Sequence, residues 1–167
     1  QLAHHGLEPA ANLVIRDNPE DIKFFFSDAW KRSDLIITTG GLGPTTDDIT
    51  RENIAQALGE QLVFGASVES ALKERFSQLG QSMPEISLRQ CYRPENAEIL
   101  KNPYGTAPGI WLKKDKKILV MLPGPAREMH PMFEEQVVPR LQKEGLFPEI
   151  DCYLQIRTAG VGESAVA

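Results

Sequence analysis

Hydrophobic residues fall into two kinds of pattern along the chain, short continuous runs and helical spacing. The continuous runs predict strands at residues 13–15, 34–39, 110–112, 117–122 and 153–157. Apolar positions three and four residues apart predict helices over residues 22–32, 49–58, 67–79 and 127–143, with a shorter helical candidate over 84–92. Pro131 and Pro139 predict bends or breaks in the last helix. Strands that alternate with helices are typical of an α/β protein.

Local residues mark the ends of several of these elements. Asn18 is a predicted helix cap, because its side-chain oxygen can accept hydrogen bonds from free backbone amides, and Pro19 then takes the first helical position. Ser67 is the predicted cap of the helix at 67–79, and Gly80 is the residue predicted to end it. Residues 114–116 separate two predicted strands and indicate a hairpin.

The length and composition are those of a globular protein. The 167 residues suit one domain or slightly more, at about 150 residues per domain. The content of 41% hydrophobic and 25% charged residues argues against disorder. Residues 1–6 resemble the last turn of a helix and residues 162–167 the start of another, so we expect a piece of a longer protein. The main domain is predicted to span residues 1–150.

Several classes of protein are disfavoured. No apolar run approaches the roughly 18–20 residues that a membrane helix requires, and no secretion signal is visible. The net charge of −5 lacks the basic excess of nucleic-acid binders, so we expect neither nucleic acid nor membrane as a partner. Cys91 and Cys152 are too few for a disulfide scaffold or a cysteine zinc site, and the expected location is the reducing cytoplasm. The three histidines show no metal-ligand spacing.

The densest group of candidate site residues follows the strand at 34–39. It consists of three glycines, two threonines and two aspartates: Gly40, Gly41, Gly43, Thr45, Thr46, Asp47 and Asp48. The glycines let backbone amides approach a ligand, and the helix that follows directs its positive end at a bound anion. One of the two aspartates is expected to cap that helix while the other faces the ligand, in either order.

Two further loops are candidates for the same site. Residues 122–128 form either a rigid connector before a helix or a second anion site, in which amides near Gly124 and the side chain of Arg127 meet a phosphate. Residues 102–109 are rich in proline and glycine and are typical of a turn. Ligands bind at the carboxyl ends of strands in open α/β sheets, so the loops at 40–50 and 122–128 should share one rim. Asp17 is either a turn residue or a carboxylate of a metal or ligand site.

Four motifs, in this order, resemble the amino-terminal domain of the CinA (competence/damage-inducible protein) family. They lie at residues 40–50, 102–109, 122–125 and 160–164, and the resemblance covers nearly the whole chain. It implies a molybdopterin-binding-like fold of the MoaB/MogA type, a three-layer α/β/α sandwich. The family begins with a strand and a Gly-Asp-Glu segment that this sequence lacks, so we expect the sandwich without its first strand. Residues 151–167 resemble the start of the family's small linking domain.

The resemblance implies one of two activities, either metal-dependent hydrolysis of ADP-ribose to AMP and ribose 5-phosphate, or binding and adenylylation of molybdopterin. It also implies that Asp48 holds the ligand and Mg²⁺, and that Asp17 is the other acidic member of the site. The expected catalytic residues are Asp17, Asp47 and Asp48, of which Asp47 and Asp48 hold the divalent metal. The expected substrate-binding and phosphate-binding residues are Gly40, Gly41, Gly43, Thr45, Thr46, Gly105, Thr106, Pro123, Gly124 and Arg127.

Three functions therefore stay open at this point. Cleavage of a phosphoric anhydride needs anion-binding amides and a divalent cation with oxygen ligands, which makes a nucleotide pyrophosphatase the first hypothesis. The second is a molybdopterin-handling enzyme, and the third is a non-catalytic nucleotide-binding module. Relatives of this fold commonly form homo-oligomers, so a homo-oligomer is expected.

Overall fold

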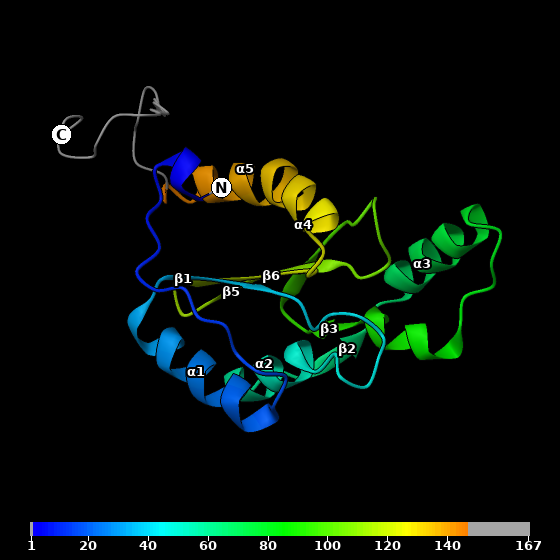
Figure 1. Cartoon of the computed structure of the whole chain (residues 1–167), viewed down its shortest axis with the longest axis horizontal. Helices are drawn as coiled ribbons and strands as arrows, with labels where there is room; N and C mark the ends of the chain where they lie inside the picture. Colours follow the sequence, from blue (N-terminus) through cyan, green and yellow to red (C-terminus); the bar gives the residue numbers. More distant parts are fainter. Residues whose placement is uncertain (1, 147–167) are drawn as a thin grey trace, which may run out of the picture. The chain divides into compact units, whose positions relative to one another are not determined.

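A four-stranded sheet organises the chain in the computed structural model, which describes residues 2–146 (Figure 1). Its strands are β1 (Leu35–Thr39), β4 (Ala97–Leu100), β5 (Gly109–Lys114) and β6 (Lys117–Leu122), in the order β1-β6-β5-β4. β1 runs parallel to β6, and the other two pairs are antiparallel. The predicted hairpin is confirmed as β5 and β6. Its turn residues Asp115 and Lys116 both have a positive φ, as a hairpin turn of type I′ requires.

Helices cover both faces of this sheet, which gives the three layers expected of an α/β/α sandwich (Figure 1). On one face lie α1 (Pro19–Arg32) and α2 (Thr50–Leu58), and on the other lies α4 (Ala126–Met132). After α4 the helical chain continues through the π-helical turn η3 (Phe133–Val137) into α5 (Val138–Lys143). The predicted helix at 127–143 is therefore confirmed, with Pro131 inside α4 and the π turn directly after it.

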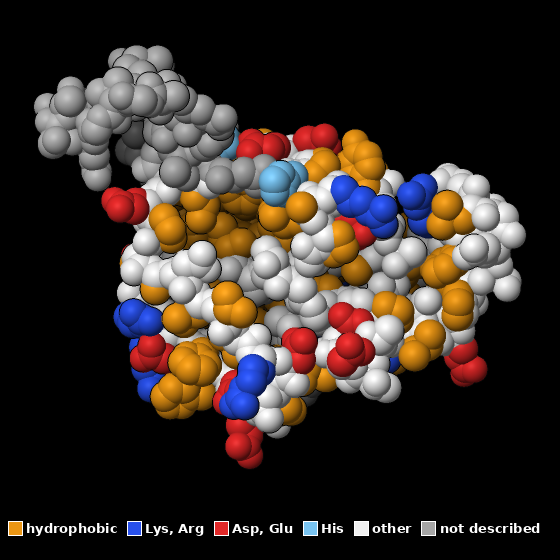
Figure 2. Space-filling view, in the orientation of Figure 1, with side chains coloured by type: hydrophobic (Ala, Val, Ile, Leu, Met, Phe, Trp, Pro, Cys, Tyr) orange, Lys and Arg blue, Asp and Glu red, His pale blue; other side chains and the backbone are white. Residues whose placement is uncertain are grey.

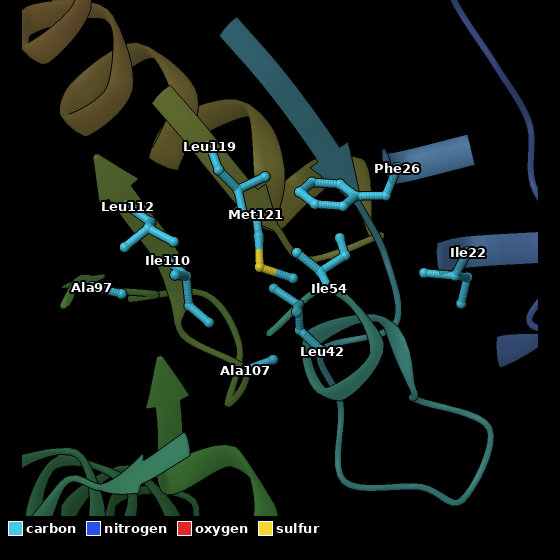
Figure 3. Packing of buried hydrophobic residues seen from close by; sticks show 10 residues of the cluster. All are labelled: Ile22, Phe26, Leu42, Ile54, Ala97, Ala107, Ile110, Leu112, Leu119 and Met121. Atoms are coloured by element: carbon cyan, nitrogen blue, oxygen red, sulfur yellow. The ribbon is translucent and has the colours of Figure 1, made fainter. Parts of the chain in front are cut away.

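The main core lies between the sheet and the layer of α1 and α2. Alternate residues of β5 and β6 point to this side because successive side chains of a strand face opposite ways. Figure 3 shows them packed with side chains from α1, α2, β4 and the loops that follow β1 and β4: Ile22, Phe26, Leu42, Ile54, Ala97, Ala107, Ile110, Leu112, Leu119 and Met121. On the opposite face, a side chain at Gly109 would meet Met132 of α4, so the helix packs closely on β5 there.

A smaller arm extends from the sandwich and contains the elements that the sequence pattern least revealed. It consists of β2 (Leu62–Phe64), α3 (Ala66–Gln78), the 3-10 helix η2 (Glu85–Cys91) and β3 (Tyr92–Pro94), with β2 and β3 paired antiparallel. Val68, Leu72 and Cys91 form a separate small core in it. Burial raises the pKa of the Cys91 thiol, which makes it an inert packing residue.

Residues 13–140 form one compact unit, and the described residues of a second unit are 2–12 and 141–146. The first unit contains the whole sheet and the arm. The described part of the second begins with η1 (Leu2–His5), which is followed by Gly6 with a positive φ. The expected strand at 153–157 and linking segment at 151–167 lie outside the described residues. Among residues 2–146, no helix is long and apolar enough to cross a membrane.

Two local expectations are wrong, and a third, the helical candidate at residues 84–92, is confirmed and made more specific. Residues 13–15 are not a strand: Leu13 is half exposed, Val14 is fully exposed, and only Ile15 packs against the core. A three-residue strand needs a neighbour for its backbone hydrogen bonds, and none of the described strands pairs with this segment. Ser67 does not cap α3, which begins at Ala66 without a side-chain cap. The candidate helix at 84–92 is a 3-10 helix, η2.

Because β6 lies in the middle of the sheet, shortening one of its side chains should lower the free energy of unfolding strongly. Leu119→Ala should lower the free energy of unfolding by about 3–4 kcal/mol, because it leaves a cavity in a fully buried site. Leu13→Ala is the matched control, and its half-exposed side chain should cost only about 0.5 kcal/mol. Urea unfolding followed by circular dichroism measures both. Similar losses in the two variants would contradict the described core.

Candidate functional site

The carboxyl ends of β1 and β6 lie side by side, and a loop leaves from each. Thr39 is the register partner of Leu122, and the Gly40 amide donates a hydrogen bond to the Leu122 carbonyl at 2.9 Å. A side-chain carbon added to Gly124 would lie 3.5 Å from Gly40 Cα, so the two loops are in close contact. The expectation that both loops share one rim is confirmed.

The first loop is closed by a carboxylate and not by a helix cap. Asp48 Oδ2 accepts hydrogen bonds from the Thr45 amide at 3.0 Å and from the Thr45 hydroxyl. Gly43 is needed beside it, since a Cβ there would overlap this carboxylate. The N-cap position of α2 is Ile49, with no side-chain cap, so the expectation that one of the two aspartates caps this helix is wrong.

Arg89 of η2 holds the first loop from the arm, although it is more than forty positions away in the sequence. Its guanidinium donates to the carbonyls of Pro44 at 3.3 Å, of Thr45, and of Asp48 at 3.1 Å. It also lies 3.4 Å from a carboxylate oxygen of Glu52 in α2. Carbonyl groups that bind one cation cannot reorient freely, so Arg89 positions the loop. Nothing in the sequence pattern indicated this residue.

The third loop, at 102–109, is built around the side chain of Asn102. Its Oδ1 accepts from the amides of Tyr104 at 3.1 Å and Gly105 at 2.9 Å. Its Nδ2 donates to the Ala107 carbonyl and to Glu128 Oε2, both at 2.8 Å. Glu128 is a buried residue of α4, and a side chain at Gly105 would overlap its carboxylate. The loop is therefore tied to the helix that follows the second loop.

These three loops and α3 enclose one cavity of about 760 Å³. That volume is in the range of small-molecule and cofactor sites, roughly 300–1,000 Å³. Nine predicted site residues line it: Gly40, Gly41, Gly43, Asp48, Gly105, Thr106, Pro123, Gly124 and Arg127. The face of the molecule shown in Figure 2 has Lys and Arg side chains between α4 and α3.

Four predicted site residues do not line the cavity. Thr45 and Thr46 are exposed at the tip of the first loop, although Thr45 supports Asp48. Asp47 is exposed beside them, and the Thr45 hydroxyl and the backbone amide of Asp47 lower the pKa of its carboxyl. Asp17 is exposed in the connection before α1 and follows no strand. Asp48 therefore lines the cavity, whereas Asp17 and Asp47 do not. The catalytic roles expected of Asp17 and Asp47 stay predictions.

Two polar residues of the arm line the cavity without having been predicted from the sequence. They are Arg75 of α3 and Gln90 of η2. Gln90 is only 1% exposed and donates from Nε2 to the Thr106 hydroxyl at 3.3 Å, while its Oε1 is buried without a hydrogen-bond partner. No motif surrounds either residue, and only the fold of the arm brings them to the loops.

Two carboxylates of the cavity are the residues that could contribute to a metal site. Within residues 2–146, no group of three or more His, Cys, Asp or Glu side chains could hold a metal ion. Mg²⁺ is usually bound through one or two carboxylates together with substrate phosphates and water. The cavity offers Asp48 and Glu128. Since both hydrogen bonds to Asp48 end on Oδ2, its Oδ1 accepts none from the described residues and is the better ligand.

Comparison with known proteins identifies what this arrangement is similar to. The family model described as "Probable molybdopterin binding domain" matches residues 1–143. A Clostridium botulinum (Loch Maree) protein named as competence-damage inducible is 44% identical over all of this chain. A protein of the same name from Caldicellulosiruptor saccharolyticus is 42% identical over 99% of the chain. This chain covers 40% of the length of each of these two relatives.

Two solved structures are also similar to this chain. The protein CinA of unknown function from Thermoplasma acidophilum superimposes with a TM-score of 0.73 at 29% identity, over 86% of this chain and 81% of that one. The molybdopterin biosynthesis enzyme MoaB from Thermus thermophilus superimposes with a TM-score of 0.52 at 22% identity, over 87% and 77%. The second likeness is one of fold, and it confirms the expected MoaB/MogA-type sandwich.

A pair of glycines tests how closely the first loop is packed. Gly41 and Gly59 have the same φ of +67°, but a Cβ at Gly41 would overlap Thr50 Oγ1, whereas at Gly59 nothing lies within 4 Å. Gly59→Ala should cost about 1 kcal/mol for the left-handed backbone alone. Gly41→Ala should cost roughly 1–3 kcal/mol more, because Thr50 must also move. Thermal and urea unfolding measure the difference, and equal losses would disprove the close packing.

Proposed function

The chain belongs to the molybdopterin-binding domain family, as a domain of the CinA type, and we propose that it is a metal-dependent pyrophosphatase that hydrolyses ADP-ribose to AMP and ribose 5-phosphate. Family membership itself indicates a small-molecule ligand. The observation that supports the finer proposal is the cavity, in which the glycine backbones of two strand-to-helix loops meet Asp48 and two arginines, Arg75 and Arg127.

The glycine loops suit the diphosphate group of such a substrate. Gly41 and Gly43 in the first loop and Gly124 in the second line the cavity with backbone atoms alone. Amides at such turns and at helix starts bind phosphate oxygens well, because the anion comes directly against N–H groups. Since Gly40 and Gly124 are in contact, one diphosphate can reach both loops.

Asp48 is the residue proposed to hold the metal. Thr45 fixes its Oδ2, which directs the remaining oxygen away from the loop's own hydrogen bonds. A divalent ion bound there would neutralise charge on the phosphate oxygens. The reaction needs only water besides the substrate. The oxygen of one water molecule bonds to phosphorus, the bridging P–O bond breaks so that the bridging oxygen leaves with the other phosphate, and the protons of the water pass to the two monophosphates or to solvent.

A second candidate function uses the same cavity for a pterin. The matching family model and the MoaB likeness favour it, since both are named for molybdopterin. Molybdopterin also has a phosphate, which the same loops would bind, and the carboxylates would then serve adenylylation. The two functions differ in the ligand that they require. We further propose a cytoplasmic location and a homo-oligomer, to which the exposed Phe24 and Phe25 of α1 would contribute.

Replacement of Asp48 tests the pyrophosphatase. Asp48→Asn removes the charge, but the amide oxygen can still accept the hydrogen bonds from Thr45, so the loop should keep its shape. Release of AMP from ADP-ribose in the presence of Mg²⁺ should fall by about 100-fold or more, the usual effect of losing one group that stabilises charge in the transition state. Asp115→Asn, in the hairpin turn, is the control and should leave the rate unchanged.

Either of two outcomes would overturn the proposal. Full activity of the Asp48→Asn protein would remove Asp48 from the site. Absence of AMP from the unmodified protein with several divalent ions would reject the pyrophosphatase, and would favour pterin handling or a module that binds without turnover. Asp47→Asn, measured in parallel, tests the predicted role of a carboxylate that lies outside the cavity.

A further inference from the structure

The arm presents one face of α3 to the cavity. Arg75 and Leu79 lie four residues apart, at the end of this helix, and both line the cavity. Positions four apart share a helix face, so the guanidinium and the leucine point to the same side. Leu79 is half exposed, as is Tyr104 of the third loop, which also lines the cavity.

Arg75 differs from several other arginines of the structure because its guanidinium has no hydrogen-bond or ion-pair partner among the described residues. Its side chain makes no hydrogen bond or ion pair with any of residues 2–146, and its Nε is buried without an acceptor. Arg51 also has a buried Nε without an acceptor, but its guanidinium pairs with Glu52 through Nη2. Arg89 likewise pairs with Glu52, and Arg93 donates to three carbonyls. A half-buried guanidinium that has lost water without gaining an acceptor is costly, unless a ligand supplies one.

The surroundings of Arg75 specify the kind of ligand. The other arginine of the cavity is Arg127, whose side chain is 81% exposed. Its ion pair with Glu128 is long, at 3.9 Å, so the guanidinium is available to a second anion. The buried carbonyl of Gln90 has no donor among the described residues, so it would accept a hydrogen bond from an N–H or O–H group of the ligand and not from its phosphates. Two cations from α3 and α4 therefore face a cavity whose loops already suit one phosphate.

We propose that Arg75 binds the second phosphate of a diphosphate ligand, so that α3 makes the site selective for nucleoside diphosphates over monophosphates. A guanidinium binds phosphate oxygens with two parallel hydrogen bonds, which a lysine cannot reproduce. The assignment rests on the cavity of the proposed function but not on turnover, because it concerns binding. It makes Arg75 a binding residue that sets specificity, contributed by the arm.

Calorimetric titration of the chain with ADP and with AMP, each in the presence of Mg²⁺, tests this assignment. In Arg75→Gln the affinity for ADP should fall by about 10-fold or more, while the affinity for AMP should change by less than about 3-fold. Arg75→Lys should restore part of the difference. Arg32→Gln, on the exposed surface of α1, is the matched control and should change neither affinity.

Each outcome separates this assignment from the pyrophosphatase proposal. An equal loss of ADP and AMP binding would give Arg75 a structural role only, and unchanged binding, or no ADP binding by the unmodified protein, would overturn the assignment. Selective loss of ADP binding in a protein that releases no AMP from ADP-ribose would support Arg75 while rejecting hydrolysis. Hydrolysis with an unaltered KM in Arg75→Gln would support the reaction while rejecting Arg75.

Discussion

The parallel pairing of β1 with β6 is the contact on which the rest of the site depends. Two strands distant in sequence end at the same level, and the hydrogen bond from Gly40 to Leu122 continues their ladder by one step beyond β1. Each strand then turns into a loop and a helix. Because the loops begin from a common point, their amides can face one ligand without any further device. The apolar sequence of β6, buried on both faces, fixes this register by making a slip costly.

The loops themselves are held by groups that come from elsewhere in the chain. Arg89 binds three carbonyls of the first loop from the arm, and Asn102 connects the third loop to Glu128 of α4. Such long-range hydrogen bonds restrain a glycine-rich segment whose own backbone preferences are weak. The arm therefore has two roles, to hold the first loop through η2 and to bring Arg75 to the cavity from α3.

Features that depend on neighbouring residues could be predicted from the sequence. The cap of α1 is an example, since the Asn18 side chain accepts hydrogen bonds from the amides of Glu20 and Asp21. The hairpin of β5 and β6 is another example. Features with distant partners could not be predicted: nothing local shows that residues 13–15 lack a strand neighbour, or that Asp48 turns toward Thr45 instead of capping α2. The cavity residues contributed by the arm could not be found from sequence either, because a 3-10 helix and two three-residue strands leave no clear periodicity.

Because Gly40 and Gly124 are in contact, binding of a ligand in the cavity is linked to the stability of the pairing between β1 and β6. Opening of the β1–β6 ladder would separate the two loops, so a ligand held by both binds the closed ladder and not the open one. By mass action such a ligand stabilises the folded chain by about 2.7 kcal/mol at a hundred times its dissociation constant. The concentration of the ligand would then set how well this domain resists unfolding and proteolysis, in addition to how often the cavity is occupied.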